Sequence, residues 1–234
     1  MNIHDDRSRI TAVAVPVPAD HARPLHADSA RRVLRNTYAL LGFNLGFSAL
    51  VATAAMAWGL PAPGLLLTLA GYFGLLFLVT RFRDRAAGVA LTFALTGFMG
   101  YTLGPLLSKV VALPGGTQVV AMALGATATV FLAMSAWAMT TRRDLSGMGS
   151  FLFIGMIVAV LAGIGAAVFE MGALSLAVSA MVVLLMAGML AWETQRIVRG
   201  GETNYVMATT GLFVSLFNLF TALLQLFGFT SSSD

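Results

Sequence analysis

Residues 191–227, AWETQRIVRGGETNYVMATTGLFVSLFNLFTALLQLF, decide how the rest of this chain is interpreted. The stretch begins at the end of one apolar run, passes through a short basic turn with two adjacent glycines, and enters a last apolar run. Glu193 stands at the edge of the first run, and Ser215 and Asn218 lie inside the second. Because an ionisable side chain at the edge of a membrane span is a candidate for function, we take these three residues as candidates for sensing ions or protons.

The composition of the chain is that of a multi-pass membrane protein. Of its 234 residues, 58% are hydrophobic and only 10% are charged, whereas a soluble domain carries about 25% charged residues. The net charge of +4 would suggest a nucleic-acid partner in a soluble protein. Here the arginines stand between apolar runs, so we interpret them as topology signals and expect a lipid bilayer and no nucleic acid as the partner.

Seven apolar runs, each near the ~20 residues that a membrane helix needs, predict an all-α fold. The predicted spans are residues 38–60, 64–80, 86–107, 118–139, 149–169, 173–192 and 207–227. The segment before them, from Met1 to Ala30, combines prolines and scattered charges without a helical period, which predicts a flexible tail. We therefore divide the chain into a tail, residues 1–30, and a membrane domain, residues 31–234.

The distribution of basic residues predicts the orientation of the chain. Of the 14 lysines and arginines, all but Lys109 fall on one side of a seven-span arrangement. Loops rich in lysine and arginine stay in the cytoplasm, so we expect a cytoplasmic N-terminus and a C-terminus on the opposite side.

Small residues are spaced for close helix packing in two of the spans. Gly42 and Gly46 form one GxxxG pair, and Gly100 and Gly104 form another. Such pairs let helix backbones approach each other, either between two copies of a chain or inside one bundle, and with seven spans we favour the second. Pro105 is expected to kink or end the third span, because proline removes one helix hydrogen bond.

The side chains available in the spans argue against an enzyme, a metal site and a bound cofactor. All three histidines, at positions 4, 21 and 26, lie in the tail, and the spans contain no aspartate. A serine nucleophile therefore has no histidine beside it, and no aspartate pair is possible. The sequence also lacks the HExxH zinc motif and the phosphate-binding GxxxxGK[ST] motif.

Two interpretations of Glu193 remain open from the sequence. It is either an interfacial carboxylate paired with Arg196 three residues later, or a partly desolvated carboxylate that gates a path. Ser215 and Asn218 lie three residues apart and so on one helical face, which serves either interhelical hydrogen bonding or a water-lined route beside Glu193. Asn44 and Ser48 in the first span are expected to face the same interior.

The last two spans resemble those of the Bax inhibitor-1 (TMBIM) family. The matching residues there are Glu193-Thr194-Gln195, Asn204-Tyr205 and LFVSLFNLF at 212–220. Further matches are VLRNTY at 33–38, PAPGL at 61–65, TGFMGYTLGPLL at 96–107, VAMALGAT at 120–127 and TTRRD at 140–144. The resemblance covers nearly everything after the tail and is strongest for the bacterial YccA type.

The resemblance implies a seven-helix fold whose last helix is central and surrounded by the other six. It also implies one of two functions. Bacterial YccA-type members are described as modulators of the FtsH protease, a membrane-anchored AAA+ enzyme, in the inner membrane, and the tail is then the candidate for engaging that protease. The wider family is associated with a pH-sensitive leak of calcium or protons through paired acidic residues. Here Glu193 occupies the first acidic position, but Ser215 occupies the second, so we favour the protease modulator.

Overall fold

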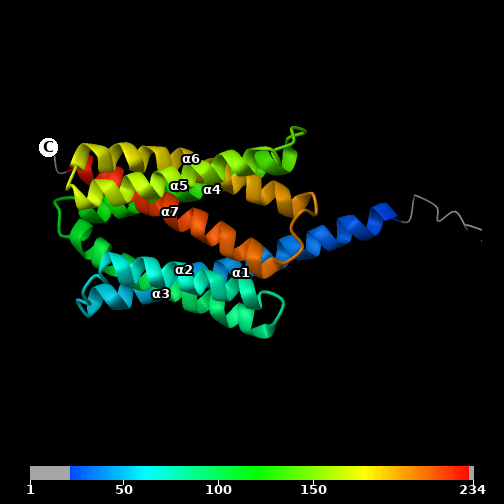
Figure 1. The fold of residues 1–234 in the computed structure, drawn as a ribbon, viewed down its shortest axis with the longest axis horizontal. Helices are drawn as coiled ribbons and strands as arrows, with labels where there is room; N and C mark the ends of the chain where they lie inside the picture. Colours follow the sequence, from blue (N-terminus) through cyan, green and yellow to red (C-terminus); the bar gives the residue numbers. More distant parts are fainter. Residues whose placement is uncertain (1–21, 232–234) are drawn as a thin grey trace, which may run out of the picture.

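The computed structural model describes residues 22–231, which fold into seven helices without a strand in that range (Figure 1). The helices are α1 (Ala22–Ala57), α2 (Leu65–Phe82), α3 (Ala86–Val111), α4 (Gly116–Thr140), α5 (Met148–Val168), α6 (Gly172–Val198) and α7 (Tyr205–Ser231). Each contains a stretch long and apolar enough to cross a membrane. The prediction of an all-α membrane fold with seven spans is confirmed.

Two helix ends differ most from the prediction. Residues 22–30, assigned to the tail, form the first turns of α1, and Pro24 is compatible with this because the first helical turn does not need its missing N–H. The other part of the predicted tail, residues 1–21, lies outside the described residues. The second difference is the end of α6, which lies not at Trp192 but at Val198.

Proline and glycine account for three of the six breaks between helices. Pro61 and Pro63 stand in the connection between α1 and α2. Gly115, directly before α4, and Gly200, after α6, adopt the left-handed conformation, with φ of +68° and +75°. Pro105 does not end its helix, because α3 continues past it to Val111.

The helices form two groups with α7 between them. Figure 1 shows α1, α2 and α3 on one side and α4, α5 and α6 on the other, while α7 crosses obliquely between the groups. Within its membrane span, 56% of α7 is buried, compared with at most 39% in the other spans. α7 packs against α1, α2, α3, α4 and α6, but α5 packs only against α6. The predicted ring of six helices around α7 is therefore wrong for α5.

The first group is held together by close packing of α3 on α1. A Cβ atom added at Gly100 would overlap the backbone carbonyl of Ser48, and one added at Gly104 would lie 2.6 Å from the Cβ of Ala55. This GxxxG pair thus serves packing inside the bundle. The other pair, Gly42 and Gly46, has no atom of another helix within 4 Å of an added Cβ in the part of the chain that the structure describes.

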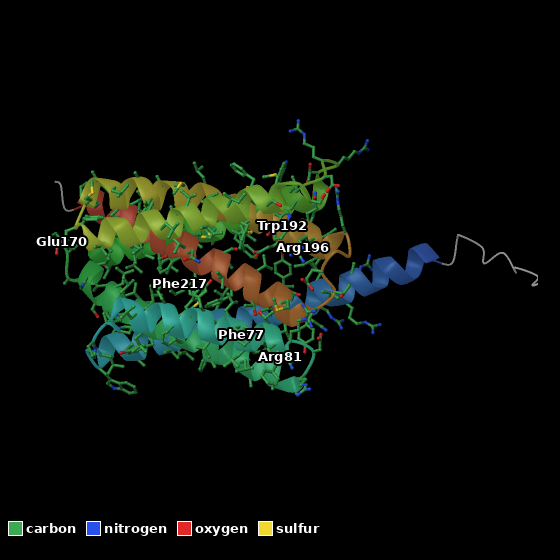
Figure 2. All side chains as sticks on the ribbon, in the orientation of Figure 1. Phe77, Arg81, Glu170, Trp192, Arg196 and Phe217 are labelled. Carbon is green, nitrogen blue, oxygen red and sulfur yellow. The ribbon has the colours of Figure 1, made fainter. Side chains whose placement is uncertain are left out.

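One end of the bundle collects the connections that contain arginine, and we call it the arginine end. Figure 2 shows Arg81 and Arg196 at this end and Glu170 at the opposite one. The side-chain amide of Gln195 accepts a hydrogen bond from the backbone N–H of Leu145 (2.7 Å) and donates one to the carbonyl of Arg143 (2.9 Å). Arg199 adds an ion pair with Asp144 at 3.1 Å, so the end of α6 fixes the α4–α5 connection.

Asn204 fixes a second connection to the start of α7. Its side-chain oxygen accepts hydrogen bonds from the backbone N–H groups of Val206 and Met207, which is the geometry of a helix N-cap. Its amide nitrogen donates to the carboxylate of Asp84 (2.8 Å) and to the carbonyl of Arg83 (3.1 Å) in the α2–α3 connection. The residues around the glycine turn therefore tie the arginine end together.

Candidate functional site

Glu193 lies within α6 and faces α7. The hydroxyl of Ser215 donates a hydrogen bond to Oε2 of Glu193 over 3.0 Å. Gly211, one turn before Ser215, lies under the other carboxylate oxygen, where an added Cβ would come within 2.5 Å of Oε1. A glycine at this position therefore leaves the room that the carboxylate occupies. The sequence placed Glu193 and Ser215 in one candidate site, and the structure brings the two side chains together.

Arg196 is not the partner of Glu193. Its guanidinium forms an ion pair with Glu202 at 3.1 Å and lies over the ring of Trp192, 4.6 Å from the ring centroid. Figure 2 shows Trp192 and Arg196 near the same end of α6. The interpretation of Glu193 as an interfacial carboxylate paired with Arg196 is thus wrong, because Glu202 in the α6–α7 connection takes that arginine.

Glu193, Ser215 and Asn218 line one cavity of about 530 Å³, which we call the inner cavity. Its walls come from α2, α3, α5, α6 and α7, together with Glu202. Most of the lining is apolar and includes the aromatic residues Tyr72, Phe73, Phe98, Phe153 and Phe217 and the methionines Met99, Met156, Met186, Met189 and Met207. A carboxylate therefore sits in a chamber of aromatic and thioether side chains.

The inner cavity reaches the lipid-facing surface between α2 and α5. These two helices both line the cavity but do not pack against each other. Phe73 of α2 and Phe153 of α5 belong to the lining and are 52% and 62% exposed. In a bilayer such exposed apolar side chains meet acyl chains, so the cavity has a lateral opening toward lipid.

A second cavity of about 490 Å³ lies toward the opposite end, and we call it the outer cavity. Its lining includes Glu170 at the α5–α6 turn and Ser179, whose hydroxyl donates to the side-chain oxygen of Gln225 over 2.7 Å. Asn218 lines both cavities, and its amide nitrogen donates to the carbonyl of Val214 on its own helix. Asn218 is thus the residue at which the two cavities adjoin.

Two further polar residues do not belong to this site. The side-chain oxygen of Asn44 accepts a hydrogen bond from the hydroxyl of Thr96 over 3.0 Å, and Ser48 lies against Gly100. Both side chains are buried between α1 and α3. The expectation that they face the interior beside Glu193 is wrong. Among residues 22–231 there is also no group of three or more acidic, histidine or cysteine side chains that could hold a metal ion.

The polar residues at the end of α6 and in the α6–α7 connection were not recognised from the sequence as contacts. Gln195 and Asn204 stand in motifs that the resemblance singled out, but their partners lie in the α4–α5 and α2–α3 connections, and Glu202 pairs with Arg196 of α6. The signal that could have pointed to them is the density of polar side chains in ETQR and GETNY, which is high for a short turn between two apolar helices.

Fold and site together define a seven-helix membrane protein with a laterally open cavity. In this cavity a serine of the last helix donates a hydrogen bond to a glutamate of the helix before it. Residues 30–232 match the model of the family described as "Inhibitor of apoptosis-promoting Bax1". This match covers most of the chain, and the chain belongs to that family, the Bax inhibitor-1 family.

Bacterial relatives match over nearly their whole length. A protein of Escherichia coli (strain K12) named "Modulator of FtsH protease YccA" is 48% identical over 204 residues, which are 87% of this chain and 92% of that protein. A counterpart in Escherichia coli O6:H1 with the same identity and coverage is named "Inner membrane protein YccA". An uncharacterized protein of Pseudomonas aeruginosa is 46% identical over 202 residues, covering 86% of this chain and 91% of its own.

Proposed function

We propose that this protein binds a membrane-anchored AAA+ protease of the FtsH type in a bacterial inner membrane and limits its proteolysis of membrane proteins. The observation that carries the proposal is the 48% identity to the Escherichia coli modulator over 92% of that protein's length. In this role the protein acts by binding and catalyses no reaction of its own.

The orientation in this proposal places the arginine end and the N-terminus in the cytoplasm and the C-terminus in the periplasm. The positive-inside rule supports it, since the arginines of three connections gather at this end. α1 begins at Ala22, ahead of its membrane span Ala30–Ala57, and extends away from the bundle at the same end (Figure 1). The residues before α1 are thus attached where a protease at the cytoplasmic surface would meet them, and an extended chain reaches up to ~3.3–3.6 Å per residue.

The packing of α1 suggests how a bound protease would be restrained. A protease that pulls on the tail must extract α1 first. This helix is held by the close approach of Gly100 and Gly104, by the buried hydrogen bond between Thr96 and Asn44, and by the hydroxyl of Thr209, which donates to the carbonyl of Thr37 (3.2 Å). The protein would thus engage the enzyme through the tail and occupy it while resisting extraction.

Affinity purification from native membranes in mild detergent tests the binding. The full-length protein is compared with a form that lacks residues 1–21 and keeps the whole of α1, and with a control in which residues 2–21 stand in scrambled order. We expect the membrane AAA+ protease to be enriched with the full-length protein and lost with the truncated form. If the protease is absent from the full-length sample, the proposal is wrong. If it is retained by the truncated form, residues 1–21 are not the contact.

A second candidate function is a leak of cations, either calcium or protons, through the bundle. The observation that favours it is the position of Asn218 between the inner and outer cavities, with Glu193 in one and Glu170 in the other. Of the two carboxylates that line the inner cavity, Glu202 is paired with Arg196, and calcium usually takes six to eight oxygen ligands, which favours protons over calcium.

Flux measurements in proteoliposomes test the leak. The variant Glu193→Gln should lower the flux of the wild-type protein, whereas the control Lys109→Gln, at a position that lines neither cavity, should leave it unchanged. Flux equal to that of empty vesicles would rule out this candidate without touching the protease proposal.

A further inference from the structure

One carboxyl group that lines the inner cavity has no cation of the protein beside it, so a bound cation would stabilise its ionised form. Its charged lining residues are Glu193, Arg196 and Glu202. Arg196 and Glu202 form an ion pair with each other at the arginine end of the cavity. Glu193 has only the neutral hydroxyl of Ser215 as a hydrogen-bond donor among the described residues. The cavity therefore offers a ligand one carboxylate that no cation of the protein neutralises by direct contact.

The uncharged lining suits an apolar body with a positive charge. Five aromatic rings surround the space, and an aromatic face attracts a cation within about 6 Å of the ring centroid by roughly 0.5–2 kcal/mol, most strongly when the cation is desolvated. Five methionines share the lining, and their flexible thioether side chains adapt to ligands of different shape. The volume of about 530 Å³ falls within the ~300–1,000 Å³ typical of pockets for small molecules.

The access route selects ligands that dissolve in the bilayer. The lateral opening between α2 and α5 is bordered by Phe73 and Phe153, both of which face lipid. A small hydrated ion would have to lose its water before it passed these rings, which is costly. A molecule whose charge is shielded by apolar groups already partitions into the membrane and meets the opening there.

We propose that the inner cavity is a binding site for lipophilic organic cations, which enter from the bilayer between α2 and α5 and place their charge beside Glu193. The proposal goes beyond protease modulation and does not depend on it. An anion of the same shape meets the same apolar walls but lacks the attraction to the rings and is repelled by the carboxylate.

A matched pair of ions tests the charge selectivity. Tetraphenylphosphonium and tetraphenylborate have nearly the same shape and opposite charge, and both enter membranes. Equilibrium dialysis with the full-length protein in lipid nanodiscs, corrected for empty nanodiscs, should show saturable binding of the cation at one site per chain and none of the anion. Equal binding of both ions, or binding of neither beyond empty nanodiscs, would overturn the proposal.

Variants locate the site. Glu193→Gln should weaken binding of tetraphenylphosphonium at least about tenfold, since a single charge contact in a weakly polar site is worth ~1.4 kcal/mol or more. The control Glu170→Gln removes a carboxylate outside the inner cavity and should leave binding unchanged.

A second variant keeps the test decisive if Glu193→Gln does not fold. Val160 lines the cavity from α5 and is 37% exposed, so Val160→Trp narrows the opening without touching the carboxylate. It should also weaken or slow binding of the cation. Wild-type binding in both folded variants would place the cation elsewhere and contradict the assignment.

Discussion

The two faces of α7 differ in what they contact. One face is fully buried against neighbouring helices and carries mostly large apolar side chains, namely Val206, Thr209, Leu212, Phe213, Leu216, Leu219, Phe220, Leu223 and Leu224. The other lines the two cavities and carries Met207, Gly211, Val214, Phe217, Asn218, Thr221 and Gln225. Phe217 is labelled on this second face in Figure 2, between the two groups of helices.

This difference separates stability from function along one helix. In lipid, helices associate mainly through van der Waals packing and interhelical hydrogen bonds, so a face that leaves cavities gives up stability that the packed face has to supply. Gly211 and Ser215 line the inner cavity, where the glycine leaves room for Glu193 and the serine donates a hydrogen bond to it. Substitutions on the packed face should therefore mainly lower stability, whereas substitutions on the cavity face should mainly change function.

The largest effect on stability is expected on the packed face. Leu219 is fully buried, and Leu219→Ala should destabilise the protein by ~2–5 kcal/mol because the helices around it cannot close the space. Val214→Ala, on the cavity face, removes methyl groups next to a space that already exists and should cost far less. Thermal unfolding of both variants in detergent compares them. Equal losses would mean that the two faces do not differ in packing.

A smaller loss is expected where α3 packs on α1. In Gly100→Val the new side chain meets the carbonyl of Ser48, which should cost ~1–3 kcal/mol through overpacking. On the proposed function, the weaker hold on α1 should also make the protein a substrate of the protease instead of its modulator. Pulse–chase measurement of its half-life, with Gly42→Val at an open position as the control, checks this. A half-life as long as that of the wild type would contradict the role of α1 packing.

A substitution at the start of α7 should lower the stability by a smaller amount. Asn204→Ala removes the N-cap of α7 and the link to Asp84, and loss of such a cap costs ~0.5–2 kcal/mol. The unfolding temperature should fall, and hydrogen exchange should rise in the first turn of α7 and in the α2–α3 connection. Unchanged exchange in that connection would show that Asn204 does not hold it.

On the cavity face, Gly211→Ala should change function more than stability. Alanine is favoured over glycine inside a helix by about 1 kcal/mol, so the unfolding temperature should stay the same or rise. The added Cβ displaces the carboxylate of Glu193, and affinity for tetraphenylphosphonium should fall about threefold, which is less than 1 kcal/mol. Unchanged affinity would mean that the position of the carboxylate does not matter.

The smallest effect on stability is expected in the α4–α5 connection, which belongs to neither face of α7. Hydrogen bonds from Ser146, first from its backbone N–H, lower the pKa of Asp144 below its ordinary value of 3.8, and Arg199 adds to the effect. A lowered pKa contributes stability that is present above the unfolded value and lost as the pH falls through the folded one. Asp144→Asn should therefore lower the unfolding temperature slightly at neutral pH and not in strong acid. A loss that is equal at both pH values would contradict this contribution.

The number of spans could be predicted because two independent signals agree. Apolar runs of the right length and the alternation of arginines between them both require seven helices. The end of α6 could not be placed, since Thr194 and Gln195 look like loop residues. Both lie in α6, where the hydroxyl of Thr194 is 3.3 Å from that of Ser135 on α4 and the amide of Gln195 bonds to the α4–α5 connection.

Of the two interpretations of Glu193, its contacts agree with the one that placed Ser215 beside it. Spacing along one helix offered Arg196 as the partner of Glu193, whereas the actual donor, Ser215, lies on the next helix. Asn44 was misplaced for the same reason, because a polar side chain in a span shows that it faces protein but not which helix it faces. The inner cavity itself depends on α2 and α5 not meeting, which no local pattern records.

The central claim is that this protein modulates a membrane AAA+ protease, and the rate of proteolysis tests it most directly. The purified protease and a membrane-protein substrate are reconstituted in proteoliposomes with and without the full-length protein. We predict that the substrate is degraded more slowly in its presence, and that the form lacking residues 1–21 has less effect. An unchanged rate of degradation at saturating amounts of the full-length protein would contradict the claim.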